Sequence, residues 1–341
     1  MRSSTLNSQK SLIENCKLSG VNESFTIYRQ VPRNNRHRPT AVTIGNFDGV
    51  HRGHQAIVKR LISIAKQRNL VPAVVTFEPH PRAYFGMRGN RPELIPAQVN
   101  GLRDKATALA CLGIEQLIVL RFDHLLADMS ADAFIRDILV DGLNTRWLLV
   151  GEDFRYGHKR SGDIHLLRRA GRQFGFEVEA IADVVGEEGY RISSSDIRAA
   201  LAHGSMDRVE RLLGRPYQLS GHVIHGRKLG RNIGYPTLNV RVPERCAARS
   251  GVYVARVRGL AETALPGVAS LGVRPTVDDS GQLLLEVHLF DCNIDAYGKL
   301  VQVELLEFLR DEEKFSDLET MMTAIDNDAQ CARDYFALHG L

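Results

Sequence analysis

Residues 40–54 read TAVTIGNFDGVHRGH, and this stretch decides the fold of the N-terminal part of the chain. Its first part, Ala41–Ile44, is a short unbroken apolar run of the kind that forms a buried parallel strand. Beyond the glycine-rich part, apolar side chains from Val58 to Ala65 repeat at helical spacing. The stretch therefore predicts a strand, a glycine-rich turn and then a helix.

The same alternation of strand and helix continues to about residue 181. Four further apolar runs are predicted strands, namely Val71–Phe77, Gln116–Leu120, Trp147–Val150 and Phe176–Ile181. Helical patterns lie near residues 100–112, 130–140 and 164–174, and Ser130 is placed to cap its helix. This order is typical of a doubly wound, Rossmann-like α/β domain, whose ligands bind at the carboxyl ends of the strands.

The pattern changes after about residue 203. The predicted strands there are Val252–Val257, Leu283–Phe290 and Val301–Phe308, and the last helical pattern is Asp317–Leu338. In Leu283–Leu289 every odd position is apolar, so Glu286 and His288 are predicted on the opposite face of that strand. A mainly antiparallel β-barrel with a C-terminal helix is the economical interpretation. Gly204 marks the predicted seam between the two domains.

The composition favours a reduced, cytoplasmic protein of two domains. The chain has 341 residues and a net charge of +4, from 44 basic and 40 acidic side chains; this weak charge does not favour nucleic-acid binding. The five cysteines are scattered without a CxxC pair, so neither disulfides nor a zinc site is indicated. No apolar run is long enough for a membrane span. The polar first 21 residues are predicted to be a disordered extension, and nothing indicates an obligatory protein partner.

The turn between the first strand and helix has the features of a nucleotide-binding loop. Gly45, Gly49 and Gly53 allow the backbone to approach a ligand closely, and the helix start offers N–H groups to an anion. His51 and His54 are three residues apart and share one helical face. Two imidazoles there can stabilise charge on an α-phosphate while pyrophosphate leaves. The alternatives are a tight turn with two surface histidines and, less well supported, a zinc site.

Two later segments could belong to the same site. Residues 191–198 read RISSSDIR, which places hydroxyl groups at a helix start and Arg198 one turn further, suited to β- and γ-phosphates. Residues 151–157 read GEDFRYG and can supply an aromatic wall and charge for a flat ligand. Taken alone, the first could be a simple serine cap and the second an ordinary loop.

Together, these motifs resemble those of the bacterial bifunctional riboflavin kinase/FAD synthetase family. The resemblance rests on residues 43–54, 76–82, 150–163 and 193–198, and extends from about residue 22 to the end of the chain. It implies an FMN adenylyltransferase domain at 22–203 and a riboflavin kinase domain at 204–341. The implied ATP contacts of the first domain are Gly45, Asn46, Phe47, Asp48, Gly49, His51, His54, Ser194, Ser195 and Arg198, with the two histidines catalytic. Its implied flavin contacts are Asp153, Phe154 and Arg155.

A second glycine-rich segment, GRKLGRNIGYPTLN, occupies residues 226–239. It lacks the ending of a P-loop, but its backbone N–H groups and basic side chains could wrap a nucleotide; the alternative is a basic surface hairpin. In riboflavin kinases a Pro-Thr-x-Asn element holds Mg²⁺ and ATP, and a strand glutamate is the base. The resemblance therefore implies ATP contacts from Gly226, Lys228, Gly230, Gly234, Thr237 and Asn239. It also implies Thr237 and Asn239 as Mg²⁺ ligands, Glu286 as the base and Arg310 near the flavin.

The leading hypothesis is an enzyme with two activities. The second half phosphorylates riboflavin to FMN with ATP, and the first half couples FMN to AMP from ATP, giving FAD and pyrophosphate, both with Mg²⁺. One alternative is a nucleotidyltransferase for another phosphorylated substrate with a non-catalytic barrel, which would not need Glu286, Thr237 and Asn239. Another is a tRNA-binding protein, disfavoured by the low charge and by the lack of a Lys-Met-Ser-Lys-Ser-type loop.

Overall fold

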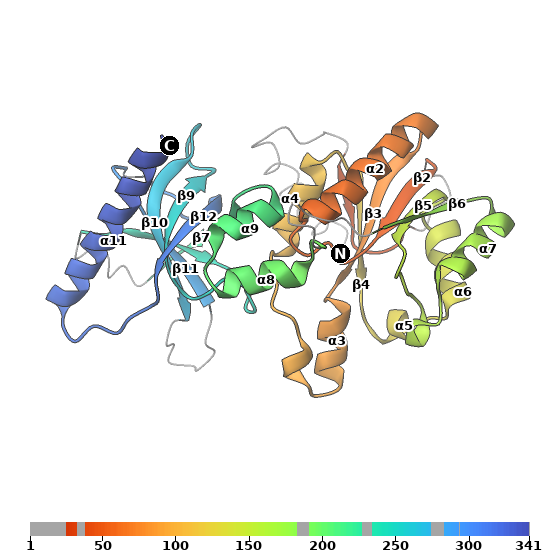
Figure 1. Ribbon diagram of the computed structural model, residues 1–341, viewed down its shortest axis with the longest axis horizontal. Helices are drawn as coiled ribbons and strands as arrows, with labels where there is room; N and C mark the ends of the chain where they lie inside the picture. The colour runs from red at the N-terminus through yellow and green to blue at the C-terminus, as the bar shows by residue number, and fades with distance from the viewer. Residues whose placement is uncertain are drawn as a thin grey trace. The chain divides into compact units, whose positions relative to one another are not determined.

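The computed structural model divides the chain into two compact units (Figure 1). The first unit is Met1–Pro96 with Lys105–Ile192, and the second is Ala97–Asp104 with Ser193–Leu341. The structure describes residues 25–32, 38–182, 191–226, 234–273, 283–292 and 294–340. The chain therefore passes from one unit to the other three times, whereas the sequence predicts one seam, at Gly204.

The first unit is built on a parallel six-stranded sheet in the order β1-β4-β3-β2-β5-β6. The strands are β1 (Thr26–Tyr28), β2 (Thr40–Ile44), β3 (Val71–Glu78), β4 (Gln116–Arg121), β5 (Thr145–Gly151) and β6 (Glu177–Ile181). From β2 the chain builds outward through β3 and β4 and then returns to the other side of β2 for β5. The order reverses between β2 and β5, and ligands of doubly wound sheets bind outside such a switch point. The doubly wound prediction is confirmed.

Helices complete this unit. They are α2 (Arg52–Arg68), α3 (Pro81–Arg88), η1 (Pro92–Leu94), α4 (Leu102–Cys111, of which residues 102–104 are grouped with the second unit), α5 (His124–Ala127), α6 (Ala131–Ala133), η2 (Phe134–Val140), η3 (His158–Arg160) and α7 (Ile164–Phe174). The cap predicted at Ser130 is confirmed, since its Oγ accepts the N–H of Ala133 at 3.1 Å. The buried side of α2 includes Val58 and Leu61, as the helical spacing predicts. No helix in the described part of the chain is long and apolar enough to cross a membrane.

The second unit is a closed six-stranded barrel in the order β10-β11-β8-β7-β12-β9, with antiparallel pairing. Its strands are β7 (Tyr217–Ile224), β8 (Thr237–Arg241), β9 (Gly251–Arg258), β10 (Leu265–Val273), β11 (Leu283–Leu289) and β12 (Leu300–Arg310). Leu285 and Val287 are fully buried in its core. The barrel prediction is confirmed.

In the described part of the barrel unit, the helices that lie wholly within it are α8 (Ser194–Ala202), α9 (Met206–Leu213) and α11 (Leu318–His339). Helix α11 runs along the outside of β9 and β10 (Figure 1), where Ala332 and Phe336 bury against strand side chains. Ile197 and Leu201 of α8 share one buried cluster with α9 and the barrel. Because α8 packs in this way, the division of the chain falls before Ser193 and not at Gly204.

Candidate active sites

The histidine pair lies where β2 ends and α2 begins, at the carboxyl edge of the parallel sheet. His51 is the N-cap of α2, and its Nδ1 accepts the backbone N–H of His54 at 3.3 Å. The two imidazole rings stack with their centroids 3.7 Å apart. The ring of Phe47 lies 4.9 Å from that of His54. The predicted shared face of the two histidines is confirmed, and the pair is held as one rigid group at the helix start.

The turn before the pair has an unusual backbone. Phe47, Gly49 and Val50 have φ angles of 47°, 84° and 44°. A positive φ is rare for a β-branched residue such as Val50, and such strain collects at ligand-binding sites. The main chain of Asn46 is fixed to the neighbouring strand, because its carbonyl oxygen accepts the Thr76 hydroxyl at 3.1 Å.

His54 is kept neutral by its surroundings. Burial lowers its pKa well below the ordinary value, and the nearby positive charges of His51 and Lys105 lower it further. Its Nδ1 is buried without a hydrogen-bond partner among the described residues, and the same holds for Oδ1 of Asn46. Native proteins rarely leave buried polar atoms unpaired, so these two atoms mark a place for a polar ligand.

Lys105 of α4 is linked through Thr76 to the histidine loop, which the sequence analysis did not predict. Its side chain is buried, and Nζ donates to the Thr76 hydroxyl at 3.4 Å. Burial lowers the pKa of Lys105, while the carboxylates of Asp48 and Glu78 act to raise it. One signal was available: Lys105 lies four residues before the fully buried Leu109, on the buried face of the predicted helix.

The loop after β5 leaves the same edge of the sheet as the histidine loop, because β2 and β5 are neighbours. The ring of Phe154 stacks with that of Tyr156 at 5.6 Å and packs on the core of the unit. Asp153 and Arg155 lie in ion pairs with Arg191 and Asp163, at 3.9 and 3.4 Å. A role for this loop in flavin binding stays a prediction.

The serine segment begins α8 and therefore lies in the second unit. Ser193 is the N-cap, and it forms a capping box with Asp196. Arg198 donates through Nε to the carbonyl oxygen of Ala97 at 2.7 Å. The capping box stabilises the start of α8, and the Arg198 bond ties the helix to residue 97. The triphosphate contacts of Ser194, Ser195 and Arg198 stay a prediction.

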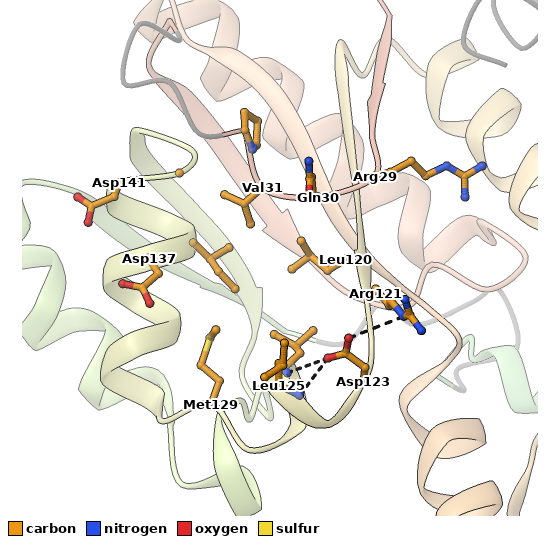
Figure 2. Close-up of a pocket in the computed structure, with 14 residues that line it drawn as sticks. Arg29, Gln30, Val31, Leu120, Arg121, Asp123, Leu125, Met129, Asp137 and Asp141 are labelled. Carbon is orange, nitrogen blue, oxygen red and sulfur yellow. Dashed lines mark hydrogen bonds and ion pairs between the residues drawn. The ribbon is translucent and has the colours of Figure 1, made fainter. Parts of the chain in front are cut away.

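A large cavity of about 1340 Å³ lies elsewhere in the first unit, beyond the ends of β1 and β4 (Figure 2). Its lining mixes apolar side chains such as Val31 and Met129 with charged ones. Asp123 on its wall accepts the N–H groups of Leu125 and Leu126 and pairs with Arg121 at 3.7 Å (Figure 2). No residue of the histidine loop is among the described residues that line it, so size alone does not identify the reactive site.

In the second unit, the outer face of the barrel carries a cavity of about 360 Å³, whose lining combines apolar side chains with several charged ones. Glu286 of β11 is directly opposite Asn239 of β8, and His288 is opposite Thr237. Side chains opposite each other in an antiparallel pair point to the same face of the sheet. Glu286, Thr237 and His288 line the cavity, whereas Leu285 and Val287 point into the core. The predicted outward orientation of Glu286 is confirmed.

The far wall of this cavity comes from β12 and α11. Arg310 forms a two-pronged ion pair with Asp328, at 2.9 and 2.7 Å. Glu312 is a further lining residue that the sequence analysis missed; it accepts a hydrogen bond from Ser270 at 3.4 Å. Burial raises the pKa of Glu312, the bond from Ser270 lowers it, and the charge of Glu286 raises it again.

A second cavity, of about 640 Å³, adjoins the same strand. It is lined by Val223, Pro236, Leu238, Tyr297 and others, and Thr237 lines both cavities. Thr237 is therefore a lining residue that the two cavities share.

Gly226 packs closely against the side chain of Asn239, next to Thr237 and the two cavities. A Cβ on Gly226 would lie 2.8 Å from Cγ of Asn239, so only glycine allows this approach. Asn239 is buried, and its amide donates to the carbonyl oxygen of Thr237 at 3.4 Å. Gly234 has a φ of 84°. Lys228 and Gly230 lie outside the described residues.

Thr237 and Asn239 offer the oxygen donors that Mg²⁺ prefers, on the face that carries Glu286. In the described ranges no three His, Cys, Asp or Glu side chains group to hold a metal. This donor set suits Mg²⁺, which usually binds one or two protein oxygens together with substrate phosphates.

Comparison with known proteins assigns each half of the chain to a family. The model described as FAD synthetase matches residues 33–196, and the one described as riboflavin kinase matches residues 213–336. The bifunctional riboflavin kinase/FMN adenylyltransferase of Escherichia coli (strain K12) is 43% identical over 297 residues, which cover 87% of this chain and 93% of that protein. The Pseudomonas fluorescens protein of the same name is 45% identical with the same coverage.

A solved structure has a similar fold over most of the chain. It is a crystal structure described as a macrolide-efflux protein from Streptococcus pneumoniae, with a TM-score of 0.74 and 29% sequence identity. The match covers 90% of this chain and 98% of that one.

Proposed function

The chain belongs to the family of bifunctional riboflavin kinase/FMN adenylyltransferases, and we propose that the histidine loop and the barrel cavity are its two active sites. The N-terminal part is the FAD synthetase and the C-terminal part is the riboflavin kinase. Its substrates are then riboflavin, FMN and ATP. A cytoplasmic location, as the cysteine usage favours, belongs to the same proposal.

For the kinase, one observation carries the proposal: Thr237 lines two adjoining cavities, one of which also contains Glu286. We place ATP in the larger cavity and riboflavin in the smaller one, so that the γ-phosphate meets the ribityl 5′-hydroxyl near Thr237. Glu286 takes the proton from that hydroxyl while the hydroxyl oxygen forms a bond to the γ-phosphorus of ATP. The bond between the γ-phosphorus and the β-phosphate oxygen breaks in the same step, and ADP leaves. Arg310, held by Asp328, contacts the flavin end.

Thr237 and Asn239 would hold Mg²⁺, which when bound neutralises phosphate charge. The chain itself contributes orientation: the buried Asn239, packed on Gly226, fixes one side of the nucleotide. Reactants that are already held in position lose less translational and rotational entropy on the way to the transition state, which lowers the activation barrier.

For adenylyl transfer, the carrying observation is the stacked pair of His51 and His54 with the unpaired Nδ1 of the latter. An oxygen of the FMN phosphate bonds to the α-phosphorus of ATP, and the bond to the β-phosphate oxygen breaks to release pyrophosphate. The neutral His54 donates a hydrogen bond to the oxygen that gains charge, at a helix N-terminus that also favours anions.

Chromatography of flavins tests both assignments. Purified protein with riboflavin, ATP and Mg²⁺ should form FMN first and FAD later. Glu286→Gln should lower FMN formation by about 100-fold or more, as loss of a general base does, while supplied FMN is still converted to FAD. His54→Ala should do the reverse.

Loss of both activities in either variant would contradict separate sites. Full adenylylation by His54→Ala would remove the histidine loop from the mechanism, and full phosphorylation by Glu286→Gln would remove the base.

A further inference from the structure

Helix α4 brings a buried cation to the loop that carries the histidine pair. Lys105 is only 8% exposed, and Nζ donates to Oγ1 of Thr76 at 3.4 Å. The Thr76 hydroxyl, itself fully buried in β3, donates to the carbonyl oxygen of Asn46 at 3.1 Å. Two consecutive hydrogen bonds therefore join the lysine to the strained turn at residues 46–50.

The surrounding charges explain why a lysine is tolerated there. Removing an ammonium group from water is costly unless carboxylates compensate. Asp48 lies on the turn itself and Glu78 at the end of β3, and both favour the charged form of Lys105 against the effect of burial. The ammonium is thus attracted both to the turn and to the strand end.

The same ammonium acts on His54. The charged or titratable groups that influence this imidazole are His51 from the loop and Lys105 from α4, and both add to the effect of burial in lowering its pKa. A neutral imidazole can donate a hydrogen bond but brings no full charge to a phosphate. A fixed cation in a water-poor site compensates for this, because electrostatic stabilisation is strong there.

We propose that Lys105 is a positioning residue for FMN adenylylation, which holds the turn at residues 46–50 through Thr76 and supplies positive charge behind the histidine pair. This inference rests on the proposed adenylyl transfer at the histidine loop. As the bond between the α-phosphorus and the β-phosphate oxygen breaks, negative charge passes to pyrophosphate. The Lys105 charge favours that separation, and the turn keeps its shape while it happens.

Lys105→Met tests the proposal in the full-length enzyme, because it keeps the length of the side chain and removes both charge and donor. The kcat for FMN adenylylation should fall about 100-fold, with a change of less than about threefold in the KM for ATP. Riboflavin phosphorylation should not change. The acid limb of the adenylylation pH profile should move to higher pH, since one charge that lowers the His54 pKa is gone. Lys105→Arg should restore the profile and most of the rate.

Two further variants separate charge from structure. Thr76→Val breaks the hydrogen-bond relay but keeps the charge, so it should lower kcat without moving the acid limb. Lys66→Met removes an exposed lysine of the same unit and should change neither quantity. Fluorescence of Trp147, the only tryptophan, reports whether the first unit is folded.

The outcomes are distinct. If Lys105→Met keeps its rate to within about twofold, or loses rate without a shift of the acid limb and without rescue by Lys105→Arg, the proposal is overturned. If adenylylation survives in His54→Ala, the proposed site itself is wrong. If it is lost in His54→Ala but unaffected in Lys105→Met, only the role of Lys105 fails.

Discussion

Among single residues, His54 shows most clearly how the fold sets the chemistry. A histidine is ordinarily half-protonated near pH 6.5. Here, burial together with the charges of His51 and Lys105 lowers the pKa, so the folded first unit holds a neutral ring at physiological pH. In the proposed mechanism, adenylyl transfer therefore begins with a neutral hydrogen-bond donor, whose charge does not depend on small changes of pH.

This lowered pKa predicts a loss of stability in acid. Below about pH 6.5 the unfolded chain binds a proton at His54 that the folded unit excludes, so the free energy of unfolding falls by up to about 1.4 kcal/mol per pH unit. The fall ends where pH reaches the lowered pKa of the folded state. Urea unfolding followed by Trp147 fluorescence, from pH 5 to 7.5, measures it. His54→Gln should show a shallower slope, and equal slopes for the two proteins would contradict the assignment.

The residue patterns predicted the histidine pair and the side of β11 on which Glu286 lies, because both follow from local spacing. They could not predict that His54 is neutral, which depends on long-range burial. Glu312 was missed for the same reason: its place beside Glu286 depends on how β12 closes the barrel and leads into α11.

At the scale of helices and strands, a continuous apolar run was sufficient to predict a strand from the sequence, whereas an interrupted run was not. The strands β2 to β6 were predicted to within a few residues, including the partly exposed edge strand β6. The structure adds β1, which has three residues, and β7, β8 and β10. In β7 and β10 the apolar pattern is interrupted by residues such as Gly221 and Pro266. Pro266 is tolerated because it lies at the start of β10, before the pairing with β11 begins at Gly267. Gly221 lies where Val240 of β8 approaches closely, since a Cβ there would be 2.6 Å from its Cγ1.

The pairing of β7 with β8 yields a prediction about the kinase. Ile224 pairs with Asn239, and Gly226 then passes against the Asn239 amide. Gly226→Ala must displace that side chain, and FMN formation should fall about 10- to 100-fold, as misplacement by an ångström can cause. Gly101→Ala is the matched control, because its Cβ would meet nothing closer than 3.7 Å. Steady-state rates with riboflavin and with FMN measure both reactions. An unchanged kinase rate, or an equal loss of adenylylation, would contradict this account.

Over the whole molecule, the histidine loop and the barrel cavity lie in units with separate cores. Glu286→Gln protein should fail to make FAD from riboflavin, and so should His54→Ala protein. A mixture of the two should make FAD, because FMN released by one variant is a substrate for the other. The double variant should not. A mixture that accumulates FMN without FAD would show that the two activities cannot be supplied by different molecules.

The route of the chain also limits how this protein can be dissected. Residues 97–104 leave the ribosome early, yet they belong with a barrel whose remaining residues begin at Ser193. There the Tyr217 hydroxyl donates a hydrogen bond to the carbonyl oxygen of Val99 at 2.8 Å, and the side-chain amide of Asn100 donates one to the carbonyl oxygen of Gln218 at 2.9 Å. A gene split at any single codon therefore leaves one unit incomplete. A barrel transplanted into another protein without this eight-residue strip would lose the contacts at Tyr217 and Gln218.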